Sequence, residues 1–161
     1  MTVISCTPNE DELALTLTAE FTASSQQIWE LWSNPRKLEQ WWGPPTYPAT
    51  FTELELAKGG RAAYYMTGPD GEKLGGQWDI LTADATDTIA FDDFFADEQG
   101  NRNDSLPTSH TVVTISGTGD LTRMVIRSSF DSAEDMRQLL EMGMVEGFSL
   151  AVGQIDAILA E

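Results

Sequence analysis

The amino-acid sequence predicts an α+β fold in which one antiparallel sheet packs against a long C-terminal helix. Residues 13–21, LALTLTAEF, alternate apolar and polar side chains, as a strand with one buried face does. From residue 49 to residue 130, short β-rich segments alternate with turn residues. Residues 132–160 contain no proline and carry apolar side chains every three or four positions, which is typical of an amphipathic helix. Because short turns join neighbouring strands, we expect the sheet to be antiparallel.

Two short helices are expected between the first strand and the rest of the sheet. The sequence SSQQ that begins at Ser24 has the spacing of a capping box, and apolar residues follow at helical intervals. Pro35 suits the first position of a second helix. We expect this second helix to include both Trp41 and Trp42 and to end at Gly43. Neighbouring helical residues point about 100° apart, so one tryptophan can enter the core while the other covers something else.

The remaining strands complete a sheet of about six to seven strands. Residues 1–11 are expected to form an irregular N-terminal lead-in, and residues 96–109 a long hairpin loop. The pair Gly75-Gly76 falls inside a strand, where it indicates a bulge. After the first strand, we expect strands at residues 49–56, 61–67, 73–81, 88–95, 110–117 and 121–130.

The helix at residues 132–160 is expected to be continuous and, at roughly 40 Å, long enough to cover the whole sheet. Gly143 and Gly147 lie inside it, although a glycine in a helix interior costs about 1 kcal/mol relative to alanine. Two explanations remain open. The small residues either leave room for a ligand or allow close packing against a strand.

The composition indicates one domain and excludes several classes of partner. With 161 residues the chain suits a single domain with a substantial core, which we place at residues 1–161. Its net charge of −17 repels phosphate backbones and anionic head groups, so nucleic acid and membrane surfaces are not expected partners. The lone cysteine, Cys6, forms no internal disulfide, and the N-terminus lacks the pattern of a signal peptide, which predicts a cytoplasmic protein.

Signals of catalysis and of metal binding are weak. His110 is the only histidine, so a histidine cluster for a metal cannot form, and we expect no metal site and no cofactor. A solvated surface explains the acidic pair Asp92-Asp93. No nucleophile stands beside a base, so no catalytic residue is assigned. An enzyme would need a buried acid or base in a cavity, for which Tyr64 and Glu55 are the best candidates.

Three stretches carry a resemblance to a known family. They are IWELWSNPRKLEQWWGP at residues 28–44, KGGRAAYYMTGPDG at residues 58–71, and EGF at residues 146–148 with the apolar residues that follow. These stretches resemble the AHSA1-like family (activator of Hsp90 ATPase homologue 1-like) of the START-like, or SRPBCC, helix-grip superfamily. The resemblance implies a curved antiparallel sheet that grips the long helix, with a cavity between them in many members. Members bind lipids, hormones or polyketides, a few catalyse cyclisation, and the family's namesakes stimulate the Hsp90 ATPase.

The expected function is the binding of a small apolar molecule in a cavity between the C-terminal helix and the sheet. One alternative is a co-chaperone-like activator of an Hsp90-type ATPase, with a chaperone as its partner. Another is a cyclase-like or hydrolase-like enzyme that uses the same cavity.

Candidates for the lining of such a cavity come from the inward positions of the strands, the tryptophan pair and the apolar stripe of the helix. Taken singly, each is an ordinary core residue, and together they describe an apolar, aromatic interior. The tryptophan pair is interpreted either as a structural plug or as part of the cavity mouth. The candidates are Trp41, Trp42, Tyr64, Met66, Trp78, Ile80, Phe91, Met124, Ile126, Phe130, Met144, Phe148 and Val152.

Overall fold

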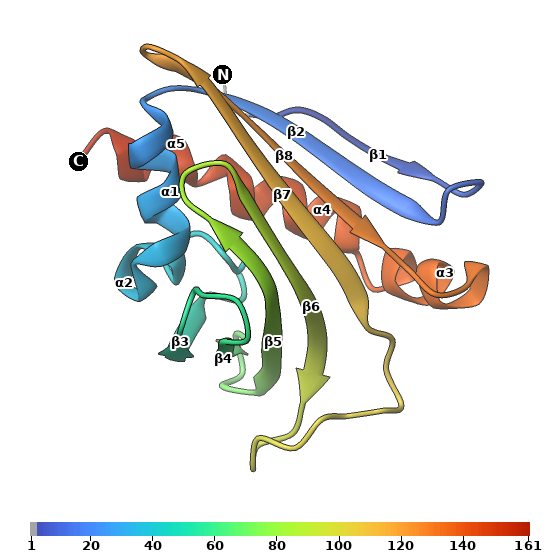
Figure 1. The fold of residues 1–161 in the computed structure, drawn as a ribbon. Helices are drawn as coiled ribbons and strands as arrows, with labels where there is room; N and C mark the ends of the chain where they lie inside the picture. Colours follow the sequence, from blue (N-terminus) through green and yellow to red (C-terminus); the bar gives the residue numbers. More distant parts are fainter. Residues whose placement is uncertain (1–2) are drawn as a thin grey trace.

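One antiparallel sheet of eight strands organises the chain in this computed structural model, which describes residues 3–161 (Figure 1). The strands lie in the order β1-β2-β8-β7-β6-β5-β4-β3, and every neighbouring pair is antiparallel. After β2 the chain crosses to the far edge of the sheet and then returns strand by strand until β8 lies beside β2. The strands are β1 (Val3–Asn9), β2 (Ala14–Thr22), β3 (Ala49–Leu54), β4 (Arg61–Thr67), β5 (Lys73–Asp84), β6 (Thr88–Ala96), β7 (Ser109–Thr118) and β8 (Leu121–Ser129).

The expected count of six to seven strands was too low, because β1 occupies a segment that we expected to be irregular. Only Val3 and Cys6 of β1 are partly buried, so the strand shows no alternation of apolar and polar residues. It pairs with β2 along its length, and Pro8 lies on this edge strand, where its missing N–H is tolerated. The strand forms because its backbone pairs with β2. Such pairing requires no alternation of apolar and polar side chains, so the sequence carries no signal for this strand.

The two short helices carry the chain from β2 to β3. In α1 (Ser25–Ser33) the capping box is present as expected, with Ser24 Oγ accepting the Gln27 N–H at 3.2 Å and the Gln27 side chain accepting the Ser24 N–H at 2.9 Å. The second helix, α2 (Pro35–Leu38), is shorter than expected. It ends before the tryptophan pair, which lies in the turn that follows.

The C-terminal helix is broken, whereas we expected it to be continuous. It consists of α3 (Ala133–Glu141), α4 (Met144–Gly153) and α5 (Ile155–Leu159), with a bend of 59° after α3. The bend falls at Gly143, whose φ of +90° lies in the left-handed region that glycine adopts without strain. Within residues 3–161 no single helix is long and apolar enough to cross a membrane, and α3 meets that test only when joined to α4 and α5 across the bend.

A large aromatic cluster fills one part of the covered face of the sheet. The Trp78 ring stacks on Phe91 with centroids 4.1 Å apart, and Trp42 meets Trp78 edge-on at 4.8 Å. The Trp41 ring packs edge-on against Trp32 at 4.8 Å. Apolar residues of α1, α4 and α5 surround these rings. This aromatic cluster anchors the turn after α2 to the middle of the sheet.

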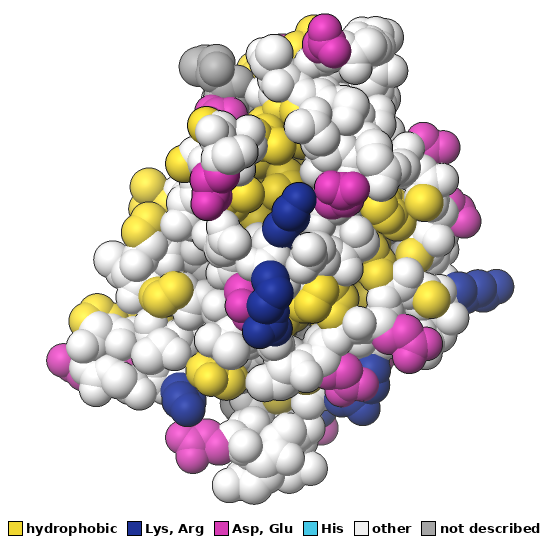
Figure 2. Space-filling model, turned by 90° about the vertical axis from the view of Figure 1, so that its left-hand side faces the viewer, with side chains coloured by type: hydrophobic (Ala, Val, Ile, Leu, Met, Phe, Trp, Pro, Cys, Tyr) yellow, Lys and Arg dark blue, Asp and Glu magenta, His cyan; other side chains and the backbone are white. Residues whose placement is uncertain are grey.

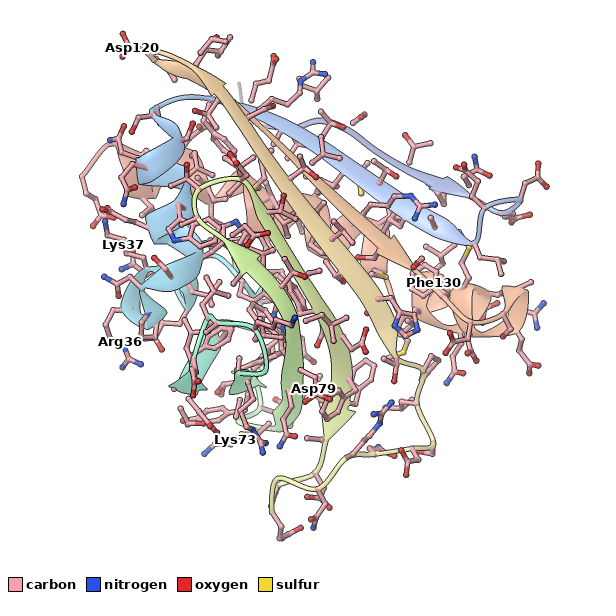
Figure 3. The ribbon with its side chains drawn as sticks, viewed as in Figure 1. Arg36, Lys37, Lys73, Asp79, Asp120 and Phe130 are labelled. Atoms are coloured by element: carbon pink, nitrogen blue, oxygen red, sulfur yellow. The ribbon has the colours of Figure 1, made fainter. Side chains whose placement is uncertain are left out.

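A second, smaller cluster lies under α3. It packs Leu15 and Phe130 against Met136 and Leu139 of that helix. Phe130 lies between the end of β8 and the start of α3 (Figure 3). Phe148 of α4 contacts both this α3 cluster and the aromatic cluster, so it marks the seam between them. The break in the C-terminal helix lies near the same seam.

Candidate functional site

A cavity of about 240 Å³ lies at the seam, between the sheet and the broken helix. Residues of β4 and β6 form its floor, together with the start of β7. The turn after α2, the end of α3, the break and the first turns of α4 form its other walls. The lining residues are Trp42, Pro44, Tyr64, Met66, Asp93, Phe94, Phe95, Ser109, Leu139, Met142, Gly143, Met144, Gly147 and Phe148.

Gly147 gives the cavity part of its space. A side-chain carbon added at this position would have no heavy atom within 4 Å apart from its own helix backbone and chain neighbours. The glycine is therefore not there to let α4 approach a strand. Of the two explanations that the sequence left open, the geometry matches the one in which a small residue leaves room. The break at Gly143 adds to this effect, because it turns α3 away from the line of α4.

One end of the cavity is polar. The Tyr64 hydroxyl of β4 donates to Asp93 Oδ1 of β6 at 3.0 Å. Asp93 lies on the covered face of β6 between Phe91 and Phe95, and the surface that it retains lines the cavity. Burial raises the pKa of the Asp93 carboxyl from its ordinary 3.8 to about 7, and the Tyr64 hydroxyl and the Trp78 indole oppose part of this rise.

Two indole N–H groups border the same pair of side chains. Nε1 of Trp42 and Nε1 of Trp78 are buried and have no partner within hydrogen-bond geometry. Both nevertheless lie near enough to Tyr64 to oppose the rise in its pKa that burial and the Asp93 charge produce. Of these groups, the Tyr64 hydroxyl and the Trp78 indole are the donors that act on the Asp93 carboxylate. A buried N–H without a good partner lowers the stability of the fold by about 1–3 kcal/mol, so this end of the cavity is less stable than a fully paired site would be.

The sequence places Tyr64 by means of a glycine on the neighbouring strand. Tyr64 lies opposite Gly76 in the pairing of β4 with β5, and any side-chain carbon at Gly76 would collide with the tyrosine ring. Phe51 of β3 stacks on the ring from the other side, with centroids 4.9 Å apart. The prediction of a bulge at Gly75-Gly76 was wrong. Both glycines pair regularly, and β5 departs from regular pairing between Ile80 and Thr82 instead. Gly76 serves close approach of a ring instead.

The two neighbouring tryptophans have separate environments. Trp41 is fully buried, and its Nε1 donates to the Leu31 carbonyl at 3.0 Å. Trp42 lines the cavity and contacts the Phe148 ring edge-on at 5.9 Å. The structure brings five of the proposed lining residues to the cavity: Trp42, Tyr64, Met66, Met144 and Phe148. The others lie beside it in the two clusters: Trp41, Trp78, Ile80, Phe91, Met124, Ile126, Phe130 and Val152.

The other chemistry-bearing residues that the sequence drew attention to lie outside the cavity. His110 is on the opposite face of the sheet, with Nδ1 2.7 Å from Asp92 Oδ1 and Nε2 2.9 Å from Asp131 Oδ1. Glu55 is exposed. Burial raises the pKa of the Cys6 thiol, which disfavours the reactive thiolate. Among residues 3–161 no group of three or more His, Cys, Asp or Glu side chains is placed to hold a metal ion.

Reasoning from the sequence missed Asp93, which we had assigned to a solvated surface. The signal was the alternation of β6, in which the sequence FDDFF places Asp93 in phase with Phe91 and Phe95. Ser109, Leu139 and Met142 were also missed. The bend at the helix break brings Leu139 and Met142 to the cavity, which no periodicity shows, and Ser109 begins β7 where we expected the end of a loop.

Comparison with known proteins finds similar chains of known structure. The solution NMR structure of a protein from Arthrobacter aurescens is 48% identical, with a TM-score of 0.95 over 99% of this chain and 92% of that one. The crystal structure of protein Ms6760 from Mycobacterium smegmatis is 45% identical, with a TM-score of 0.90 over 98% of this chain and 96% of that one. No curated protein matches the chain.

More distant structures share the fold. The crystal structure of an AHSA1 protein from Silicibacter pomeroyi is 20% identical, with a TM-score of 0.72 over 91% of this chain and 97% of that one. The helix-grip arrangement fits the sheet and C-terminal helix described above. The family described as activator of Hsp90 ATPase homolog 1-like protein matches residues 22–160, and the chain therefore belongs to this AHSA1 family.

Proposed function

We propose that this protein binds one small, mostly apolar molecule in the cavity at the seam. The observation that carries the proposal is Gly147, a glycine inside a helix that faces open space within an apolar cavity. The volume of about 240 Å³ is somewhat larger than the roughly 150 Å³ cavity that holds a benzene molecule. A ligand of one or two rings therefore matches the space.

The test fills the cavity from the helix. In the Gly147→Leu variant the new side chain enters the open space, and the removal of a helix glycine favours the fold by up to about 1 kcal/mol. We expect the dissociation constant for naphthalene-2-methanol, measured by calorimetry, to rise at least roughly tenfold, which is a loss of about 1.4 kcal/mol. The thermal melt should remain cooperative and should not fall.

Gly153→Leu is the matched control. Gly153 is the last residue of the same helix, is exposed, and also has no heavy atom near an added side-chain carbon, but it does not line the cavity. This variant should bind the alcohol as the wild type does. Unchanged binding in Gly147→Leu, or equal losses in both variants, would contradict the proposal.

The two alternatives have less support. An activator of an Hsp90-type ATPase with a net charge of −17 would need a basic docking surface on the chaperone. On the face drawn in Figure 2, acidic and basic side chains are interspersed and form no patch of one sign. The enzyme alternative gains a buried carboxyl group in Asp93. Ser109 lines the cavity and could be a nucleophile, but no histidine lies beside it there to act as a base.

A further inference from the structure

We infer that the polar end of the cavity selects a ligand that carries a protonated amine, with Asp93 as its counter-ion and an aromatic or aliphatic body in the rest of the space. The inference rests on the proposed function, and it names the chemical class of the ligand. It follows from a carboxylate oxygen of Asp93 that accepts no hydrogen bond, from the aromatic rings nearby and from the charges of the lining residues.

The carboxylate of Asp93 has one oxygen to offer. Its Oδ1 accepts the Tyr64 hydroxyl at 3.0 Å, and within residues 3–161 Oδ2 accepts no hydrogen bond. The carboxylate is an acceptor when ionised, so what it can receive from a ligand is an N–H or O–H donor. The Trp78 indole is a donor close to Asp93 and the Trp42 indole is a donor close to Tyr64, but neither N–H has a partner in hydrogen-bond geometry.

Aromatic rings border the place where such a donor would lie. Trp42 meets Tyr64 with centroids 6.2 Å apart and meets Phe148 with centroids 5.9 Å apart, and all three line the cavity together with Phe95. A cation within about 6 Å of a ring face is attracted to it, and this attraction is greatest when the site is desolvated. Rings and carboxylate thus favour the same kind of head group.

The charges of the lining oppose an anion. No lysine, arginine or histidine is among the lining residues, and Asp93 is the one carboxylic acid among them. The whole chain has a net charge of −17, which raises the local concentration of cations and lowers that of anions. Carboxylic acid ligands would place a second negative charge beside Asp93 with nothing to balance it.

The titration of Asp93 gives the inference a pH signature. The titratable group that faces Asp93 is Tyr64, from β4, while β5 contributes the Trp78 indole and the helices contribute Leu139, Met144 and Phe148. With its pKa raised to about 7 by burial, Asp93 is about half ionised at neutral pH. An ammonium group would draw the carboxyl into its charged form, so amine affinity should rise between pH 6 and pH 8.

The experiment compares four naphthalene compounds of similar size at pH 8 by calorimetry. They are naphthalen-2-ylmethanamine, naphthalene-2-methanol, 2-acetylnaphthalene and 2-naphthoate. We expect the amine to bind roughly tenfold or more tightly than the alcohol, because charge-assisted hydrogen bonds are about twice as strong as neutral ones. Binding of the naphthoate should be undetectable. Between pH 6 and pH 8 the affinity for the amine should increase while that for the alcohol stays constant.

Asp93→Asn tests the assigned counter-ion. Asparagine keeps the size of the side chain and removes its charge, so the amine and the alcohol should bind with similar dissociation constants and without pH dependence. Asp79→Asn is the control, because it removes the same charge from an exposed position on β5 (Figure 3). That variant should retain the preference for the amine.

The outcomes separate this inference from the function beneath it. If the alcohol binds and the amine binds no more tightly, the ligand class is overturned while the proposed function stands. A preference for the ketone that weakens as pH rises would also overturn it, and would assign protonated Asp93 as a donor to a carbonyl. If none of the four compounds binds, the proposed function fails and the inference fails with it.

Discussion

Two neighbouring parts of the covered sheet face are built from similar residues and differ in how completely they pack. In one part the aromatic cluster closes around Trp41, whose ring is fully buried and whose indole N–H is satisfied. In the other part the next residue, Trp42, belongs to the same cluster but borders the cavity and has an indole N–H without a partner. Large aromatic residues alone therefore do not decide whether a region becomes core or cavity. A helix glycine and a buried carboxyl group make the difference here.

The largest expected effect comes from truncating each tryptophan in turn. Trp41→Ala should lower the free energy of unfolding by about 4–5 kcal/mol, because it leaves a large void and an unpaired Leu31 carbonyl. Trp42→Ala should cost about 1–2 kcal/mol less, since its ring already faces a cavity and its N–H is unsatisfied. Urea denaturation measures both values. Equal losses would remove the distinction between the packed part and the part that borders the cavity.

The second effect concerns the buried carboxyl group of Asp93 and its dependence on pH. In the folded protein the pKa of Asp93 is raised to about 7, while the unfolded chain has the ordinary value of 3.8. The folded state therefore holds an extra proton between these values, and the contribution of Asp93 to the stability of the wild type falls as pH rises from about 4 to 7. Asparagine mimics the protonated form and loses nothing.

Asp93→Asn should accordingly be more stable than the wild type by a margin that grows with pH. Between pH 5.5 and pH 7 the margin should increase by on the order of 2 kcal/mol, and above about pH 7.5 it should be constant. Urea denaturation across this pH range checks it, with Asp79→Asn as the exposed control. A margin that does not change with pH would show that Asp93 titrates as an ordinary exposed acid.

The third effect tests how Tyr64 is held at the polar end. Gly76→Ala places a methyl group against the Tyr64 ring, and such overpacking typically costs about 1–3 kcal/mol. Gly147→Ala, in open space, should instead stabilise the protein by up to about 1 kcal/mol. Thermal melts of the two variants should therefore shift in opposite directions. A shift in the same direction would contradict the contrast between a glycine that admits a ring and a glycine that leaves a space.

Most of the fold was predictable because it depends on periodic side-chain patterns. The alternation of β2 and the capping box at Ser24 are local signals, and both elements formed where expected. What the sequence could not reveal depends on the backbone or on three-dimensional placement. The strand β1 forms through backbone pairing with β2. The left-handed conformation at Gly143 breaks the C-terminal helix, although the apolar residues of the sequence continue at helical spacing across the break.

The site was less predictable than the fold for a related reason. Trp42 and Met144 carry a signal of burial, but the same signal marks residues that fill the core, such as Trp41. Asp93 carried the opposite signal, a charged residue that composition assigns to the surface. The alternation of side chains along β6 places Asp93 on the covered face together with Phe91 and Phe95. This position in the alternation outweighs the preference of a charged residue for the surface. A charged residue in phase with aromatic neighbours on a strand is thus the more informative observation.

The smallest effect belongs to the uncovered face of the same strand. Asp92, beside Asp93 in sequence, contacts His110, and its hydrogen bond raises the pKa of that histidine above its usual range, with Asp131 adding to the rise and partial burial opposing it. A raised histidine pKa contributes stability that is fully present below the unfolded value of about 6.5 and is lost as pH rises through the folded value. Because the His110 side chain is 41% exposed, solvent screens the interaction.

His110→Gln should therefore lower the free energy of unfolding by no more than about 1 kcal/mol at pH 5.5 and leave it unchanged at pH 9. Its pH dependence is opposite to that of Asp93→Asn, which changes stability most at high pH. Naphthalene-2-methanol should bind to His110→Gln as it does to the wild type, because the histidine lies on the face away from the cavity. Altered binding would mean that the contact of His110 with Asp131, just before α3, helps to hold the cavity open, and the two faces of β6 would then not be independent.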